Sequence, residues 1–210
     1  MYGEGDGVPQ DYAEAVRWYR LAADQGNADA QFALGNMYDD GRGVPQDAAE
    51  AARWFRLAAE QGDVDAQYSL GLKYDIGVGV PEDDAEAVRL YRLAAGQGFS
   101  PAQVGLGEMY NSGRGVPQDY AMAASWFLLA AEQGNPGGQS SLGSLYFSGN
   151  GVPQDYVEAH MWFNLAAAGR GGALHDFHAE ARDAVAERMT AEQVAEAQRR
   201  AREWTPTPEP

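Results

Sequence analysis

The 210-residue sequence contains no cysteine and only one lysine, Lys73. Without cysteine the chain cannot form disulfides, use a thiolate nucleophile or bind zinc through sulfur. Its 15 basic residues stand against 31 acidic ones, which gives a formal charge of −16. Such a surface repels the phosphates of nucleic acids and anionic lipids, so we expect neither as a partner. Basic or neutral proteins and peptides fit the charge better.

Long apolar runs are also missing. No segment approaches the roughly 20 apolar residues that span a membrane, so we expect no membrane insertion. The first five residues, MYGEG, have neither the basic nor the apolar part of a signal peptide. These absences do not fix the compartment: the chain is expected to be cytoplasmic, or exported if it is a processed fragment.

The tripeptide Gly-Val-Pro recurs every 36 residues, and its glycines are Gly7, Gly43, Gly79, Gly115 and Gly151. A fixed period of this length indicates tandem copies of one supersecondary unit, which needs its neighbours to complete a core. We therefore expect a single solenoid domain over residues 1–204. Its parts are the units 8–43, 44–79, 80–115 and 116–151, a degenerate unit 152–189 and a capping helix 190–204.

Each unit is predicted to contain two helices. In the first unit, Asp11 and Glu14 form a reciprocal capping pair that starts a helix at about Tyr12. Gly26 ends this helix in the left-handed conformation that glycine adopts easily, and a second helix follows and ends at Gly41. Apolar residues spaced by three and four give each helix one buried face.

Two recurring positions predict how the helices pack. Glycine stands in the middle of the second helix at Gly35, Gly71, Gly107 and Gly143. There it costs about 1 kcal/mol relative to alanine, so we expect it to allow close contact with the Ala22-Ala23 surface of the partner helix. The first helices share a bulky column that we predict to be core rather than a ligand cage, namely Trp18, Trp54, Leu90, Trp126 and Trp162.

The C-terminal stretch departs from the repeat. Residues 174–189 lack the Leu-Gly…Tyr pattern but keep apolar residues at helical spacing. Thr190 then caps a last helix with Ala197 and Trp204 on its apolar face, and its charged outer face suits a solenoid cap. Residues 205–210 include three prolines, which predicts a disordered or polyproline tail.

Residues 51–62 (AARWFRLAAEQG) and 34–44 (LGNMYDDGRGV) closely resemble the Sel-1-like repeat of bacterial proteins, which is related to the tetratricopeptide repeats. The resemblance covers Val8 to Gly151 as four full units, and the first helix of a fifth. It implies an all-α fold, an α/α superhelical solenoid of 36-residue helix–turn–helix repeats with a C-terminal helical cap. It also implies a scaffold or adaptor that binds proteins, with no cofactor and no enzymatic activity.

The start of the chain falls inside a repeat. Residues 1–5 align with Met37 to Gly41, the tail of a second helix, so the first helix should expose a face that later units cover. A truncated fragment explains this arrangement. The rival explanation is an interface, because exposed apolar repeat ends associate unless they are capped, and the chain would then self-associate through this face.

Candidate partner-binding residues are those that vary between units on one side of the first helices. Two columns are basic and consist of Arg17, Arg53 and Arg89 and of Arg20, Arg56 and Arg92. Apolar residues appear on the same side in the fourth and fifth units, namely Met122, Leu128 and Met161. First helices line the concave surface of related superhelices, so the resemblance implies a peptide-binding groove that changes from basic to apolar.

A second interpretation of these residues involves no partner. The arginines could pair with Glu14, Asp24, Glu50 and Glu60, three or four residues away, in surface ion pairs of small energy. The apolar residues could pack against the capping helices. The sequence leaves both interpretations open.

Catalytic and metal motifs are weak. There is no phosphate-binding loop and no Gly-x-Ser-x-Gly elbow. His175 and His178 lie one helical turn apart, but we expect them to be polar residues on a capping helix rather than a metal site. A hydrolase related to β-lactam-binding members of the family is the competing class, although this chain lacks their cysteines and any Ser-x-x-Lys pair. A structural segment of a longer repeat protein is a third alternative.

Overall fold

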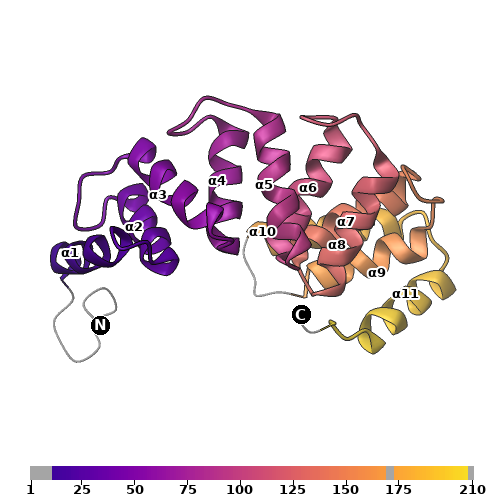
Figure 1. Ribbon diagram of the computed structural model, residues 1–210. Coiled ribbons are helices and arrows are strands. Elements are labelled where there is room, and N and C mark those ends of the chain that lie inside the picture. Colours follow the sequence, from indigo (N-terminus) through magenta and orange to yellow (C-terminus); the bar gives the residue numbers. More distant parts are fainter. Residues whose placement is uncertain (1–10, 169–172, 208–210) are drawn as a thin grey trace. The chain divides into compact units, whose positions relative to one another are not determined.

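The computed structural model describes residues 11–168 and 173–207, and this part of the chain is all helical, with eleven helices and no strand (Figure 1). The all-α prediction is confirmed. The chain divides after Gln97 into two compact units. The N-terminal unit holds α1 (Tyr12–Ala23), α2 (Ala28–Asp40), α3 (Ala48–Glu60), α4 (Val64–Ile76) and α5 (Asp84–Gly96). The C-terminal unit holds α6 (Ser100–Ser112), α7 (Tyr120–Glu132), α8 (Pro136–Ser148), α9 (Tyr156–Ala166), α10 (Ala173–Ala186) and α11 (Ala191–Glu203).

Helices pack in the order in which they follow one another. In the N-terminal unit each helix from α1 to α4 contacts the next one, and in the C-terminal unit each helix from α6 to α9 does the same. From α1 to α9 the odd-numbered helices are the first helices of the repeats and the even-numbered ones the second. Such nearest-neighbour packing is that of a repeat solenoid, in which each hairpin completes the core of its neighbour.

The first helices begin with aspartate caps, as predicted. The glutamate three residues later does not bond back to the cap, so the predicted capping pair is not reciprocal. The Asp47 carboxylate accepts hydrogen bonds from two backbone N–H groups, one of them that of Glu50, at 3.0 Å. The Glu50 side chain binds Arg53 instead of reaching back to the cap. Among the described helices, the complete capping box is that of Thr190 and Gln193 at the start of α11.

The glycine of the Gly-Val-Pro tripeptide has two reasons to recur. Gly43 has a φ of 74°, in the left-handed region, where other residues are strained. A Cβ at this position would also collide with the carbonyl group of Tyr12, because the loop after α2 crosses the start of α1. Backbone geometry therefore requires glycine at Gly43, and the same close approach recurs at Gly79 and Gly151.

The mid-helix glycines contact a different surface from the one expected. A Cβ on Gly35 would stand 2.6 Å from the ring of Phe55, a residue of the next first helix. The same relationship recurs in the pairs Gly71–Tyr91 and Gly107–Phe127. The prediction of contact with the Ala22-Ala23 surface is therefore wrong: each glycine admits a buried aromatic ring from the following repeat.

The bulky column of the first helices is core in most repeats. Trp54, Leu90 and Trp162 are at most 6% exposed, and Trp126 is half-buried. Trp18 is the exception at 52% exposure, so the core prediction is wrong there. Trp54 is covered because it shares a hydrophobic cluster with residues of α1 and α2, whereas the described residues include no helix before α1.

A ladder of glutamines, which the sequence analysis missed, joins successive repeats. The amide nitrogen of buried Gln31 donates to the carbonyl of Ala23 at 3.1 Å. The Gln31 amide oxygen accepts from Gln61, at the end of the next first helix, at 2.7 Å. The glutamine ladder comprises Gln31, Gln61, Gln67 and Gln97 in the N-terminal unit and Gln103, Gln133 and Gln139 in the C-terminal unit.

The last helix, α11, packs against α9 as a cap, with Ala197 and Ala201 buried. The chain beyond it is held as well, because the N–H of Thr207 donates to the carbonyl of Glu132 at 2.7 Å. The disordered or polyproline tail expected for residues 205–210 stays a prediction, and residues 208–210 lie outside the described part. No described helix is long and apolar enough to cross a membrane.

Candidate partner-binding groove

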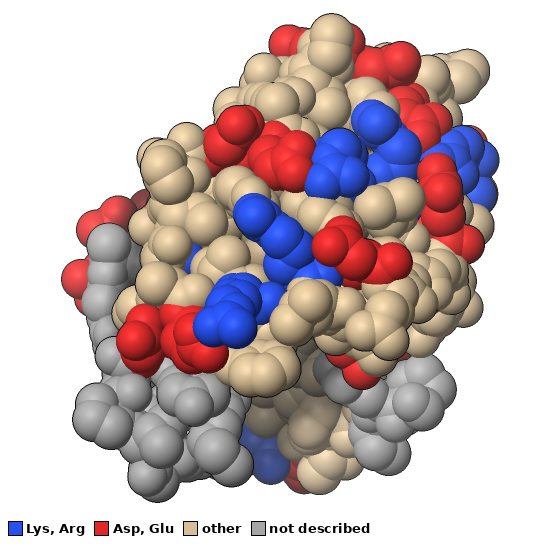
Figure 2. Space-filling model, turned by 60° about the vertical axis from the view of Figure 1, so that its left-hand side comes forward, with Lys and Arg blue, Asp and Glu red and all other residues tan. Residues whose placement is uncertain are grey.

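The six candidate arginines lie in the N-terminal unit on the first helices α1, α3 and α5, and all are exposed. Figure 2 brings the side of α1 to α4 forward, and there Lys and Arg patches lie beside Asp and Glu patches. The charges on this face are mixed rather than of one sign. Which arginines a partner could use depends on what each one already binds.

The first column is neutralised within its own helices. Arg53 binds Glu50 through two hydrogen bonds of 2.9 and 2.5 Å, and Arg89 binds Glu86 in the same way at 2.8 and 2.6 Å. Arg17 lies 3.5 Å from Glu14. The hydrogen bond from Arg53 holds the pKa of Glu50 below its ordinary value. The local ion pairs named for Arg17 and Arg53 in the second interpretation are therefore present, and Arg89 forms the equivalent pair with Glu86.

The second column behaves differently. Arg20 and Arg56 each donate to a tyrosine hydroxyl on the second helix of the same repeat, Tyr38 and Tyr74, with a distance of 2.8 Å for Arg56. Neither guanidinium has a carboxylate within 4.0 Å in the described part of the chain, and the expected ion pairs with Asp24 and Glu60 are not formed there. A hydroxyl leaves the positive charge uncompensated and most of the five N–H donors available.

The apolar candidates do not all reach the surface. Met122 and Leu128 of α7 are 38% and 37% exposed. Met161 of α9 is 7% exposed and belongs to the core cluster that also contains Ala197 and Ala201 of α11. The prediction of Met161 as a binding residue is therefore wrong, because the capping helix covers it.

A groove of about 340 Å³ lies between α3 and α5 in the N-terminal unit. Leu70 and Leu90 are buried residues at its apolar floor, and its more exposed lining includes Leu93. Two candidates from different columns, Arg56 and Arg89, line it together with Glu60 and Glu86. The groove thus combines apolar surface with a few charged groups, which is the usual composition of a binding site.

Leu90 leaves more space in the groove than a tryptophan would. The other four repeats have tryptophan at the same position, and leucine fills less space. At the preceding repeat, Trp54 is buried and the guanidinium of Arg53 lies 4.1 Å from its ring centre. The interruption of the tryptophan column at Leu90 is the sequence signal that could have located the groove. Leu70, Leu90 and Leu93 were not among the predicted binding residues.

The two neighbouring histidines have a structural role. The ring Nδ1 atoms of His175 and His178 lie 2.6 and 3.2 Å from the carbonyl oxygens of Ala167 and Ala166, at the end of α9. Helix ends have unpaired carbonyls, and these rings satisfy two of them. The described residues contain no group of three or more His, Cys, Asp or Glu side chains that could hold a metal ion.

Comparison with known proteins identifies the family. The model of the Sel1 repeat matches residues 1–27, 28–63, 64–99, 100–135 and 136–169. The chain belongs to the Sel1 repeat family. Sel1 repeat proteins are generally scaffolds for protein interactions and generally non-catalytic. Each internal match joins a second helix to the first helix of the next repeat, which is the pair linked by contacts such as Gly35–Phe55.

Solved structures of bacterial Sel1 repeat proteins are similar. A Sel1 repeat protein from Oxalobacter formigenes is 30% identical with a TM-score of 0.82, over 96% of this chain and 83% of that one. A protective antigen of uropathogenic Escherichia coli with an SLR fold is 29% identical with a TM-score of 0.55, over 97% of this chain and 58% of that one.

An immunity protein from Pseudomonas aeruginosa shares the fold. It is 18% identical with a TM-score of 0.53, over 100% of this chain and 88% of that one. A search of curated proteins found no significant match.

Proposed function

We propose that this Sel1 repeat protein is an adaptor that binds a segment of a partner protein in the α3–α5 groove. The observation that carries the proposal is the groove itself, with its floor of Leu70 and Leu90 and with Arg56 on its side. An apolar floor supplies affinity through burial, and Arg56 supplies a charge whose hydrogen bond within the described residues goes to the neutral Tyr74 hydroxyl. Arg56 and Arg89 of the first helices line it, and Leu70 of the second helix α4 lies at its floor.

The partner is expected to be a protein rather than a nucleic acid. The chain carries a formal charge of −16, and the arginines of this face alternate with glutamates. A phosphate backbone needs a continuous basic surface, which this face does not offer. A protein segment with apolar side chains and a few carboxylates matches the groove.

Hydrolysis is the competing activity, and the lining of the groove argues against it there. The described residues around the groove are arginine, alanine, glutamate, glycine, glutamine and leucine. None of these is a serine, threonine, cysteine or lysine nucleophile, and Glu86 is already bound to Arg89. Hydrolysis of the β-lactam nitrocefin by the purified chain would support the competing class.

The test uses two leucines at equivalent positions of neighbouring repeats. Leu93 lines the groove and is 43% exposed, whereas Leu129 does not line it and is 44% exposed. We expect Leu93→Asp to abolish capture of a partner from an extract of the source cells, and Leu129→Asp to leave capture unchanged. Equal capture by both folded variants would place the binding site elsewhere. Met161→Asp is unsuitable as a variant, because it would place a carboxylate in the core.

A further inference from the structure

The α3–α5 groove has a counterpart in the C-terminal unit, two repeats or 72 residues further along the chain. Glu86 and Leu90 of the groove correspond there to Glu158 and Trp162 of α9. Glu60 and Gly62 correspond to Glu132 and Gly134, around the end of α7. Each groove lies within one of the two units.

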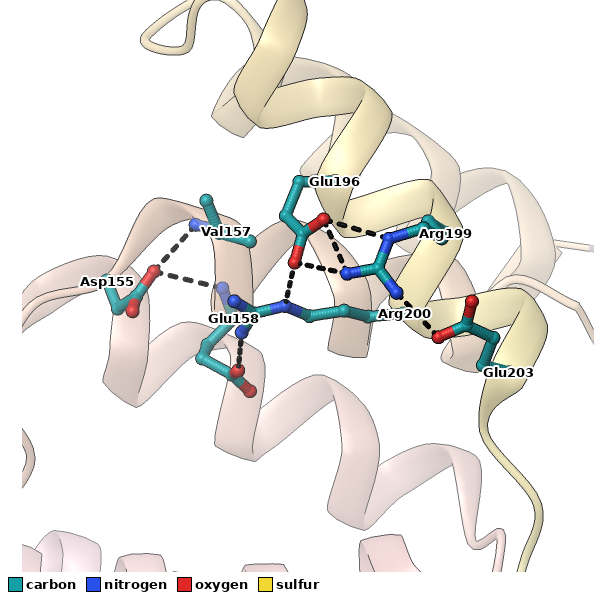
Figure 3. Close-up of polar contacts among 7 residues, drawn as sticks. All are labelled: Asp155, Val157, Glu158, Glu196, Arg199, Arg200 and Glu203. Carbon is teal, nitrogen blue, oxygen red and sulfur yellow. Dashed lines mark hydrogen bonds and ion pairs between the residues drawn. The ribbon is translucent and has the colours of Figure 1, made fainter.

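The counterpart is occupied by the chain's own C-terminal helix. Arg200 of α11 donates to the carboxylate of Glu158 at 2.6 Å, and Figure 3 shows it reaching from α11 to α9. Trp204, directly after α11, meets Trp162 edge to face with ring centres 6.3 Å apart. Ala197 and Ala201 are small residues of α11, and they belong to the same core cluster as Met161.

The three residues after Trp204 continue along the counterpart. The N–H of Thr207 donates to the carbonyl of Glu132 at 2.7 Å, and its hydroxyl contacts the same oxygen at 3.1 Å. A Cβ at Gly134 would lie 3.6 Å from Pro206 and 3.8 Å from Trp204. A helix followed by a short extended segment is therefore the shape that this kind of groove holds.

The charges of the two grooves differ at two positions. Arg56 stands where the counterpart has Leu128, and Arg89 stands where it has Met161. Arg89 already neutralises Glu86, so an arginine placed like Arg200 would meet positive charge in the α3–α5 groove. A carboxylate at that place would face Arg56 and Arg89 instead. Leu90 in place of Trp162 leaves room for a ring supplied by the ligand.

We infer that the α3–α5 groove holds an amphipathic helix of a partner protein, docked as α11 is in the counterpart. The docking face of the partner's helix carries small residues spaced like Ala197 and Ala201, and it has a carboxylate at the position that Arg200 has in α11. An aromatic side chain follows the partner's helix at the position that Trp204 has after α11. This inference rests on the proposed function and specifies the chemistry of the partner.

The probes are two labelled synthetic peptides of residues 190–207, one unchanged and one with Arg200→Glu, titrated with the full chain. The Arg200→Glu peptide is expected to bind about tenfold more tightly than the unchanged peptide, because opposite charges replace like charges. Adding Trp204→Ala to the Arg200→Glu peptide is expected to weaken its binding about tenfold, since aromatic anchors dominate such contacts.

A reciprocal change in the protein provides the matched control. Arg56→Leu with Arg89→Met gives the groove the residues of its counterpart and releases Glu86 to pair with Arg200 of the unchanged peptide. Both arginines are exposed, so the double variant is expected to fold. Its preference should reverse, with the unchanged peptide now binding more tightly than the Arg200→Glu peptide.

Several outcomes would overturn the inference. One is equal or absent binding of the two peptides to the unmodified chain. Binding that survives Leu93→Asp would show that the peptide displaces α11 rather than entering the groove. Preference for the unchanged peptide would point to α11 of a second copy as the occupant. If neither peptide binds while Leu93→Asp still abolishes capture of a natural partner, the inference is wrong and the proposed function stands.

Discussion

The backbone of Gly71 in α4 lies against the ring of Tyr91 in α5, so that a Cβ would stand 2.8 Å from the ring. Tyr91 is 1% exposed, and its hydroxyl binds Asp75 at 3.0 Å, which holds the ring in place. Gly71→Val is therefore expected to destabilise the fold by roughly 1–3 kcal/mol through overpacking. Urea denaturation followed by circular dichroism measures this change.

Gly96 provides the control for that substitution. It lies at the end of α5 with negative φ, and a Cβ there would meet nothing within 4 Å. Gly96→Ala is expected to be neutral or to stabilise the protein by up to about 1 kcal/mol through helix propensity. If Gly71→Val unfolds at the same urea concentration as the unmodified chain, close packing does not explain the recurring glycine.

The tryptophan column allows a comparison of buried and exposed rings. Trp54→Ala removes a ring that is 4% exposed and that donates to Glu50 at 3.1 Å, so a loss of about 3–5 kcal/mol is expected. Trp18→Ala removes a ring that is 52% exposed, so it should destabilise far less. Equal losses in chemical denaturation would show that Trp18 is covered in solution, as it would be in a self-associated form.

Lys73 occupies a position that is Met37 and Met109 in other repeats, and it is 8% exposed. Its ammonium group pairs with Asp39 of the preceding repeat. Lys73→Met should leave stability unchanged or raise it, because an apolar residue can replace a buried ion pair. Asp39→Asn leaves the buried ammonium without its counter-charge and should destabilise by about 1–3 kcal/mol. A double-mutant cycle in urea tests the coupling, and additive effects would contradict it.

His160 of α9 is expected to make stability depend on pH. Burial is the main cause that lowers the pKa of His160 from the ordinary 6.5; Arg182 lowers it further and Asp183 raises it. Well above pH 6.5 His160 is deprotonated in both the folded and the unfolded state, and the group makes no pH-dependent contribution to stability. As the pH falls below 6.5 the unfolded chain takes up the proton first, so stability decreases until the folded pKa is reached.

His160→Leu should remove this contribution. The measurement compares the unfolding free energies of both proteins at pH 7.5 and pH 5.5. These two pH values lie on either side of the ordinary histidine pKa of about 6.5. The unmodified chain should lose more stability between the two pH values than the variant does. The same loss in both proteins would mean that the folded state protonates His160 as readily as the unfolded state.

The sequence predicted features that depend on local backbone geometry. The aspartate caps and Gly41 at the end of the second helix follow from rules that involve a few neighbouring residues, and both are found as predicted. The contact between Gly35 and Phe55 was assigned to the wrong helix, because spacing along one helix does not reveal which neighbour faces it. Helix boundaries were therefore better predicted than helix partners.

The candidate site was less predictable for the same reason. Met161 has the spacing of an exposed residue, but α11 covers it from a distant part of the chain. Arg56 and Tyr74 are 18 residues apart, so local pairing rules do not anticipate their hydrogen bond. The groove at Leu90 depends on the absence of an indole, a difference in volume that a pattern of apolar residues does not record.

The glutamine ladder has a consequence for how such arrays change in length. Gln31 uses its amide nitrogen within its own repeat and its amide oxygen for Gln61 of the next, and Gln67 does the same with Gln97. Insertion or deletion of a whole 36-residue segment keeps these hydrogen bonds between repeats. A segment of any other length leaves buried glutamine amides without their partners. Gene duplication can therefore extend or shorten this protein only in whole modules.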